Sequence, residues 1–340
     1  MQLRKLLLKR DFTISSFQSF EAMMNFSRGQ FNFTWLFAII VGGMILFLAI
    51  FAALQFGDTQ RNAVDSSIAK EINVLTNPLQ VGFGEASYGS ITFNKETRIT
   101  NLCFEPAQDF GRNELAVATH SNIGEEWNKE GIATKIPNKY LFSEEQTVGK
   151  KYYILSKPFS LPYKVSDMLF MSSKDYCFRD SPDEILEELE RLNVPNIFLE
   201  ECSTDDSVQV CFVDGVDCDV KVFGTCNEPE CDHLFETGKV LKGGGSLDYS
   251  GNLLYGAIFS DNDLYECEVE RLLYRTNKIT EILTQKIDLM GSRGCNSNLK
   301  SKLLIFSSIL ENASIEDLSP LYLFGKNLEE INSKEYCKTW

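Results

Sequence analysis

The chain has 340 residues, a formal net charge of −15 at neutral pH, and two histidines. So acidic a chain lacks the clustered lysine and arginine that neutralise phosphates, which argues against a nucleic-acid-binding protein and against adhesion to an anionic membrane surface. Its length is sufficient for one large domain or two smaller ones with proper cores.

Residues 1–30 form a basic leader, which we place in the cytoplasm. Residues 1–56 contain five positive and two negative charges and therefore carry +3, which leaves −18 for residues 57–340. Positively charged flanks of a membrane span stay in the cytoplasm, so we expect the N-terminus inside and the acidic bulk outside the cell membrane. The leader is either a short topogenic tail or a segment removed by cleavage.

No charged residue occurs between Arg28 and Asp58. As a helix, the apolar stretch 31–54 would be about 36 Å long at about 1.5 Å per residue, enough to cross a hydrocarbon layer of about 30 Å. It is longer than the apolar region of a signal peptide, and no A-x-A site follows it before Asp58. We therefore predict a single transmembrane helix over residues 31–56, with the lipid bilayer around residues 31–54.

An amphipathic helix is expected to continue this span over residues 57–77. Val64, Ile68, Ile72 and Leu75 are spaced by four, four and three residues, which places them on one helix face, and Pro78 ends the pattern.

Residues 78–242 are predicted to form a β-rich, cysteine-containing outer domain. The expected strands are Ser90–Asn94, Arg98–Phe104, Leu115–Thr119, Lys139–Ser143, Lys151–Ser156, Tyr163–Met171, Asn196–Glu200, Ser207–Val213 and Asp219–Phe223. One helix is expected to interrupt them, opened by a capping box at Ser181 with Pro182 as its first residue.

Residues 243–340 are predicted to be helical and to pack on the β-rich part. Three glycines at 243–245 indicate a hinge-like break, and Asp261 or Asp263 can cap a following helix. Apolar residues then recur at near-heptad spacing between Tyr265 and Met290, and two shorter helices are expected near 299–311 and 315–332. The predicted fold class is therefore α+β.

All ten cysteines follow the apolar stretch, which favours a disulfide framework in an oxidising compartment. The candidates are Cys103, Cys177, Cys202, Cys211, Cys218, Cys226, Cys231, Cys267, Cys295 and Cys337. Spacing does not determine their connectivity. A zinc site at Cys226, Cys231 and His233 is a weaker alternative, because the spacing is looser than a paired C-x2-C.

No catalytic or cofactor-binding residue stands out. Neither His120 nor His233 lies near a G-x-S-x-G elbow, and the glycines at 243–245 are not followed by the lysine of a phosphate-binding loop. We expect no enzyme activity and no cofactor. Asn312 begins an N-x-S triplet that is either a glycosylation site or part of a helix cap.

Arg28-Gly29-Gln30, directly before the apolar helix and its amphipathic continuation, resembles the processing region of archaeal type IV pilin precursors. This resemblance covers about fifty residues and implies cleavage between Gly29 and Gln30, followed by packing of the exposed helix into a filament. Thr34 departs from the family because many pilins carry glutamate at that place, and the large outer part fits a minor subunit. The remainder is similar to uncharacterised archaeal membrane-anchored proteins.

The sequence favours a single-pass cell-surface protein with a structural or adhesive role, possible protein partners and a place in a pilus-like assembly. The first alternative is the same anchor with a ligand-binding or sensory domain, and the second is a membrane-tethered hydrolase.

Overall fold

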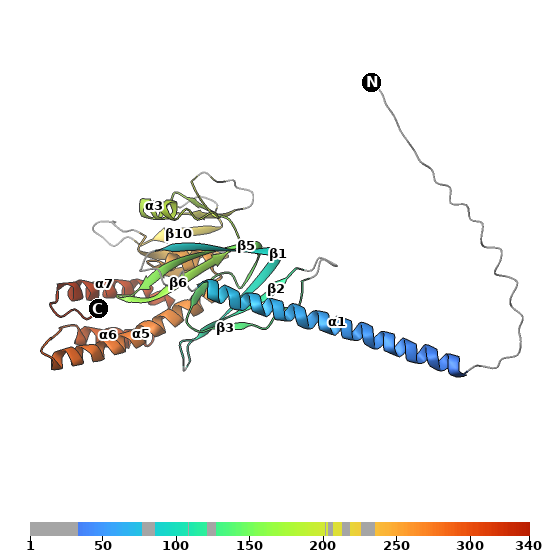
Figure 1. Cartoon of the computed structure of the whole chain (residues 1–340). Coiled ribbons are helices and arrows are strands. Elements are labelled where there is room, and N and C mark those ends of the chain that lie inside the picture. The colour runs from blue at the N-terminus through green and yellow to red at the C-terminus, as the bar shows by residue number, and fades with distance from the viewer. Residues whose placement is uncertain are drawn as a thin grey trace, which may run out of the picture. The chain divides into compact units, whose positions relative to one another are not determined.

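The computed structural model describes residues 33–76, 86–107, 109–120, 127–200, 202, 207–212, 218–225 and 235–340. The chain divides into two compact units, Met1–Gly57 and Asp58–Trp340, each of which is described by itself. The fold class is α+β, as the sequence predicts, with an N-terminal apolar helix, two β-sheets and C-terminal helices (Figure 1).

Helix α1 (Phe33–Leu75) is 43 residues long and runs without interruption through Gly57. Residues Phe33–Ala52 have a mean hydropathy of 2.6, and their side chains are almost all exposed. By length and composition, this is the one helix in the described ranges that is suited to cross a membrane. The last turns of α1 belong to the second unit and are partly buried there.

The first sheet has the strand order β3-β2-β1-β5-β6-β4. Its strands are β1 (Ser87–Phe104), β2 (Arg112–Thr119), β3 (Thr134–Ile136), β4 (Tyr140–Phe142), β5 (Gln146–Ser160) and β6 (Lys164–Ser172). All neighbours are antiparallel except β4 and β6. The two strands expected at 90–94 and 98–104 are one strand, β1, whose pairing with β5 is irregular between Thr92 and Thr97.

The end of α1 packs against one face of this sheet. Ala69 and Ile72 are buried in a core to which all six strands contribute, through Ile99, Leu115, Val117, Ile136, Leu141, Tyr152, Ile154, Leu169 and Met171. Alternate residues of β6, such as Met168 and Phe170, face the second and larger core. The sheet is therefore covered on both faces.

The second sheet has the order β12-β11-β10-β9-β7-β8. Its strands are β7 (Tyr176–Arg179), β8 (Ile197–Leu199), β9 (Val208–Cys211), β10 (Val220–Gly224), β11 (Thr237–Lys242) and β12 (Gly245–Ser250). Strands β8, β7, β9 and β10 are mutually parallel, whereas β11 and β12 form an antiparallel hairpin. Gly243 and Gly244 have φ of +54° and +79° and make its tight turn, so these glycines form a hairpin turn rather than a hinge.

Helix α3 (Asp183–Leu192) joins β7 to β8. Its N-cap is Pro182, no side chain caps it, and the hydroxyl of Ser181 is buried without a hydrogen-bond partner among the described residues. The predicted capping box at Ser181 is therefore wrong, because the helix begins one residue later than that box requires.

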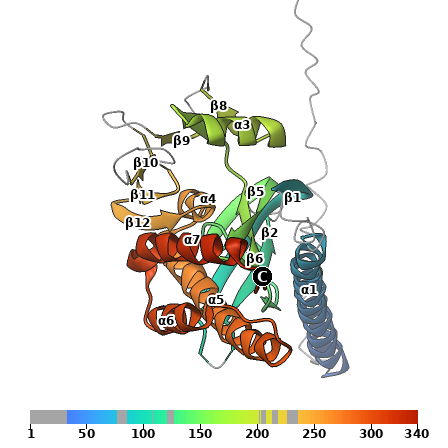
Figure 2. The ribbon, with the colours of Figure 1, turned by 90° about the vertical axis from the view of Figure 1, so that its left-hand side faces the viewer.

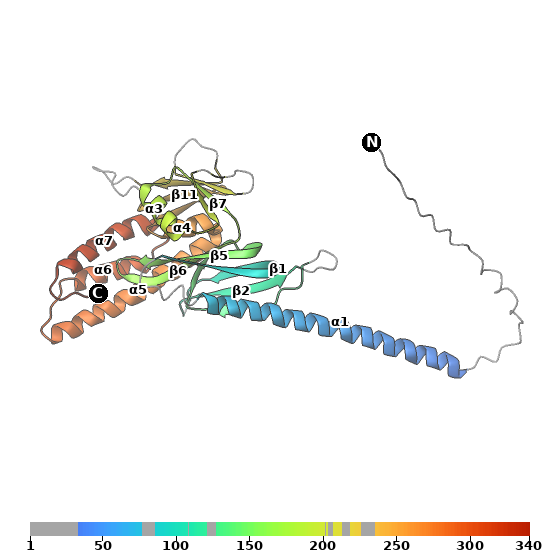
Figure 3. The same cartoon turned by 45° about the horizontal axis from the view of Figure 1, so that its top comes forward.

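The C-terminal helices are α4 (Leu253–Phe259), α5 (Asn262–Ser292), α6 (Lys300–Leu310), the short 3-10 helix η1 (Ile315–Asp317) and α7 (Leu318–Lys334). Helix α4 contacts β6 of the first sheet and β12 of the second, and α7 contacts β11 and β12 (Figure 2). Helix α5 packs on β1, β4 and β6, with α6 beside it (Figure 3). The larger core lies among these helices and the two sheets.

We predict that Ile72→Ala destabilises the outer domain by about 2–5 kcal/mol, because it leaves a cavity where α1 packs on the first sheet. Ile72 is 2% exposed, whereas Val74 on the same helix is 62% exposed. Val74→Ala is the matched control and should change the free energy of unfolding by less than about 0.5 kcal/mol. Denaturant unfolding of the full chain in detergent micelles measures both, and equal losses would show that the end of α1 is not part of this core.

Candidate functional site

The structure places the candidate residues in three groups. Eight of the ten cysteines form the disulfides Cys103–Cys267, Cys177–Cys202, Cys211–Cys218 and Cys295–Cys337. Asn312 is exposed just after α6. Gly29 and Gln30, and also Cys226, Cys231 and His233, lie outside the described residues, and no group of three potential metal ligands occurs within them.

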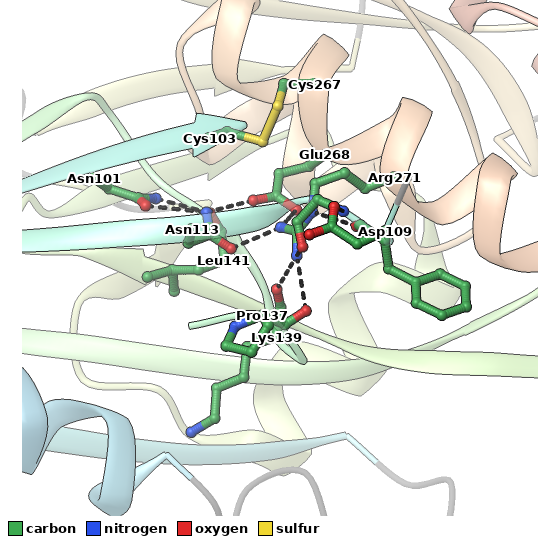
Figure 4. The surroundings of a disulfide bond; sticks show 12 residues. Asn101, Cys103, Asp109, Asn113, Pro137, Lys139, Leu141, Cys267, Glu268 and Arg271 are labelled. Carbon is green, nitrogen blue, oxygen red and sulfur yellow. Dashed lines mark hydrogen bonds and ion pairs between the residues drawn. A yellow bond between two sulfur atoms is a disulfide. The ribbon is translucent and has the colours of Figure 1, made fainter. Parts of the chain in front are cut away.

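The Cys103–Cys267 disulfide joins β1 to α5 across 164 residues of sequence. It lies beside a buried charged cluster on α5 that consists of Glu268, Arg271 and their partners (Figure 4). Glu268 and Arg271 are one turn apart and both fully buried, and Arg271 Nη1 donates to Glu268 Oε2 at 2.7 Å. Burial raises the pKa of the Glu268 carboxyl, and the neighbouring guanidinium opposes that shift.

Main-chain oxygens occupy the remaining donors of Arg271. Its Nε donates to the carbonyl of Phe110 at 3.2 Å, and Nη2 donates to that of Lys139 at 3.0 Å, with longer bonds to Gly111 and Pro137 at 3.4 Å. Gly111 has a φ of +64°, and a Cβ there would lie 2.3 Å from the oxygen of Phe104. Glycine is therefore required where the loop before β2 passes beside Arg271.

Two asparagines extend this cluster across the first sheet. Asn113 Nδ2 donates to Glu268 Oε1 at 2.5 Å and to Asn101 Oδ1 at 3.0 Å, while Asn113 Oδ1 accepts from Arg271 at 2.8 Å. Asn101 in turn donates to the Leu141 carbonyl at 2.9 Å and to the Ser143 hydroxyl at 3.0 Å. The network thus connects α5 with β1, β2 and β4, and satisfies polar groups that would be costly to bury alone.

Lys139 links this cluster to the end of α1. Its carbonyl accepts from Arg271, while its ammonium donates to the carbonyl of Asn73 and the hydroxyl of Thr76. Asn73 is in the last turn of α1 and Thr76 follows its last residue, and carbonyls at this end lack partners within the helix, so a cation is favourable there. Burial lowers the pKa of Lys139 to about 8.

The cluster around Arg271 is structural, because its charged and amide groups bind each other and the main chain. The sequence analysis missed it, since Glu268 and Arg271 look like an ordinary surface pair three residues apart on a helix. The sequence pattern that could have indicated their burial is their position beside the apolar residues Tyr265, Val269 and Leu272, which are themselves buried.

We predict that Arg271→Met destabilises the domain by about 3–5 kcal/mol, because it leaves the Glu268 carboxylate buried without its partner. Glu268→Leu combined with Arg271→Met should cost less than the sum of the two single changes, since it removes both charges. Arg275→Met, which loses a bond to the carbonyl of Val165 at 3.0 Å and a cation–π contact with Phe110 but leaves no buried charge unpaired, is the control and should cost about 1 kcal/mol. Additive losses in the double variant, measured by denaturant unfolding, would contradict this account.

A cleft of about 690 Å³ is lined by both cysteines of the Cys103–Cys267 disulfide, by the first residues of α5 and by residues of the second sheet. Its walls come from the β4–β5 connection, the ends of β1 and β11, and the junction of α4 and α5. Phe259 and Leu264 give it apolar surface, and Glu144, Glu145, Asp261 and Asp263 give it carboxylates. The cleft therefore combines apolar walls with negative charge.

The carboxylates of the cleft differ in their partners. Glu144 pairs with Lys174 at 2.5 Å, and Asp261 Oδ2 accepts from the main-chain N–H of Glu145 at 2.7 Å. The side chains of Glu145 and Asp263 are exposed and have no cationic partner among the described residues. Two carboxylates are thus available to a ligand in the cleft.

Lys242 is the single cation that lines the described cleft. Its ammonium donates to the carbonyl of Ile258, in the last turn of α4, at 3.2 Å, and to the carbonyl of Ser260, the residue that follows α4. Burial lowers the pKa of Lys242 to about 8, although Asp261 and Glu144 oppose the shift. Lys242 therefore supports the end of a helix and does not neutralise the free carboxylates.

Among the described residues that line the cleft, no nucleophile is hydrogen-bonded to a base. The Ser260 hydroxyl, which is buried in its wall, has no hydrogen-bond partner among the described residues, so no base activates it. His120 lies elsewhere, packed edge-on against Trp127 at 5.0 Å between ring centroids.

Comparisons with protein-family models, with curated proteins and with solved structures each return no match.

Proposed function

We propose that this chain is a single-pass, membrane-anchored cell-surface protein whose acidic domain lies outside the cytoplasm and has a structural or adhesive role. The observation that carries the proposal is the contrast within α1. Residues Phe33–Ala52 expose their apolar side chains, whereas Ala69 and Ile72 are buried in the domain. Exposing apolar area to water costs about 25 cal/mol per Å², which supports an apolar environment such as a bilayer for the first part of α1.

Charge and disulfides support the proposed orientation. The +3 leader precedes the span, and positive flanks remain in the cytoplasm. All eight described cysteines are oxidised, which is compatible with an extracytoplasmic domain.

A minor pilin-like subunit is the more specific form of this proposal. It rests on the resemblance around Gly29 and Gln30, and it is supported by a long helix whose first part is apolar and whose last turns pack on a β-sheet. In this proposal, cleavage after Gly29 frees Gln30 as the new N-terminus and the apolar part of α1 packs among other subunits.

We predict that Gly42→Arg/Gly43→Arg releases the protein from membranes, because two arginines at the centre of a span cost about 5–7 kcal/mol on the insertion scale. No atom lies within 4 Å of a Cβ added at either glycine, so the change does not disturb packing in α1. Gly42→Leu/Gly43→Leu is the control and should remain in the membrane fraction after carbonate extraction. Release of the leucine variant, or of the unmodified chain, by carbonate extraction would contradict a transmembrane anchor.

N-terminal sequencing of protein from its native membranes separates the pilin-like form from a plain anchor. We expect Gln30 as the first residue, together with recovery in a sheared filament fraction. A mature chain that begins at Met1 would overturn the pilin-like form and leave the anchor in place.

The cleft favours a second candidate function, the binding of an organic cation by a membrane-anchored domain. Its apolar walls and the unpaired carboxylates of Glu145 and Asp263 support a ligand with an ammonium group on an apolar body. The unpartnered hydroxyl of Ser260 in the same wall offers a further polar contact. The hydrolase alternative lacks a comparable supporting observation.

We predict that 2-phenylethylammonium binds the full chain in detergent and that the neutral 2-phenylethanol binds at least about tenfold more weakly, a difference of about 1.4 kcal/mol. Glu145→Gln/Asp263→Asn should remove this preference, whereas Glu316→Gln on an exposed site of η1 should not change it. Isothermal titration at low and high salt measures the affinity. Equal binding of amine and alcohol would rule out charge recognition by the cleft.

A further inference from the structure

Helix α6 is apolar on two opposite faces. Leu303, Phe306 and Leu310 are buried in the larger core, where the ring of Phe306 stacks on Phe324 of α7 at 5.6 Å. The outer face instead carries Leu304, Ile305 and Ile309, which are 53%, 53% and 41% exposed. A helix at the surface of a domain normally presents charged or polar residues to the solvent. An exposed apolar face such as that of α6 is therefore expected to be shielded from water by another group.

The charged side chains of α6 do not shield this face. The sequence of α6 is KSKLLIFSSIL, and its two charged residues are the lysines of its first turn. Lys300 is held by Asp288 at 2.5 Å, and Lys302 donates to Asn327 on α7 at 3.3 Å. The remaining outer positions are serine, leucine and isoleucine. Helix α6 lies beside α5 and α7, which cover its inner side (Figure 2).

Asn312 continues the outer face. Ser301, Ile305, Ser308 and Asn312 are spaced by four, three and four residues, which is the spacing of one helix face. Helical geometry persists beyond the last residue of α6, because Glu311 has φ of −58° and ψ of −30° and the N–H of Asn312 donates to the Ile309 carbonyl at 3.4 Å. Asn312 is exposed, which places it at the end of the apolar stripe.

The triplet Asn312-Ala313-Ser314 has the form of an N-glycosylation site. Ser314 has an extended backbone, with φ of −118° and ψ of −177°. Its hydroxyl bonds to the exposed carboxylate of Asp317 at 3.1 Å, and this serine therefore makes the helix cap that the sequence left open. The side chain of Asn312 takes no part in that cap, so the cap and a modified Asn312 are compatible.

We propose that Asn312 carries an N-linked glycan that covers the outer face of α6, formed by Leu304, Ile305 and Ile309. The side-chain amide nitrogen forms a bond to the anomeric carbon of a lipid-linked oligosaccharide diphosphate. The bond from that carbon to the diphosphate oxygen breaks, the lipid diphosphate leaves, and the amide gives up one proton. Such a glycan is bulky and hydrated, and it keeps the apolar face from self-association. The inference rests on the proposed extracytoplasmic position of the domain.

Mass spectrometry of peptides from protein of native membranes tests the modification. We expect a sugar-modified Asn312, loss of the modification in Asn312→Gln and Ser314→Ala, and its retention in Ser314→Thr. Gly244→Asn, made in the Asn312→Gln background, creates an N-x-S triplet with Ser246 in the β11–β12 turn. Gly244 has a φ of +79°, which asparagine tolerates, and open space around its Cβ.

The Gly244→Asn variant separates the proposed glycan at Asn312 from the proposed extracytoplasmic location of the domain. An unmodified Asn312 together with a modified triplet at 244 would overturn the glycan and leave the location intact. Absence of sugar at both places would overturn the glycan.

Dye binding and self-association test whether the glycan shields the outer face of α6. The Asn312→Gln variant should bind an apolar fluorescent dye severalfold more strongly than the glycosylated chain and should self-associate. Adding Ile305→Lys and Ile309→Lys to that variant should abolish both gains, because the outer face of α6 is then charged. Unchanged dye binding in fully unglycosylated Asn312→Gln would show that the glycan does not shield the outer face of α6.

Discussion

Arg271 places its guanidinium where α5, the loop before β2 and the loop before β4 meet, and each of these segments depends on it for hydrogen bonds. Burying a charge here is expensive, and the Glu268 carboxylate, Asn113 and several carbonyls offset that cost. Through Lys139 the same cluster reaches the last turn of α1. One buried ion pair thereby fixes how a helix from the end of the sequence and a helix from its start meet the first sheet.

Features with a strong local signal were predictable from the sequence. The apolar stretch and the stripe at Val64, Ile68, Ile72 and Leu75 correctly indicated a continuous helix, and the near-heptad apolar residues after Asp261 correctly indicated α5. Oxidised cysteines were expected, but their pairing depends on which segments meet in space. Strands β11 and β12 and helix α4 were missed, because the glycines at 243–244 were interpreted as a hinge and not as the turn of a hairpin.

The candidate sites were less predictable because they depend on tertiary contacts. The cleft brings together residues near 102, 145, 242 and 262, and no local pattern in the sequence connects those four places. The charged cluster contains ordinary residue types, so its importance follows from burial alone. The glycosylation triplet was visible in the sequence, whereas its alignment with an exposed apolar face became apparent only once α6 was placed.

The Cys103–Cys267 disulfide sets an order on the biosynthesis of this chain. A ribosome releases the N-terminal end first, so Cys103 emerges before the cysteines at 177, 202, 211, 218, 226 and 231, all of which precede its partner. Pairing in order of appearance would join Cys103 to the wrong residue. Strand β1 can therefore make its native disulfide only after α5 has been synthesised, and any earlier pairing of Cys103 must be undone by thiol–disulfide exchange.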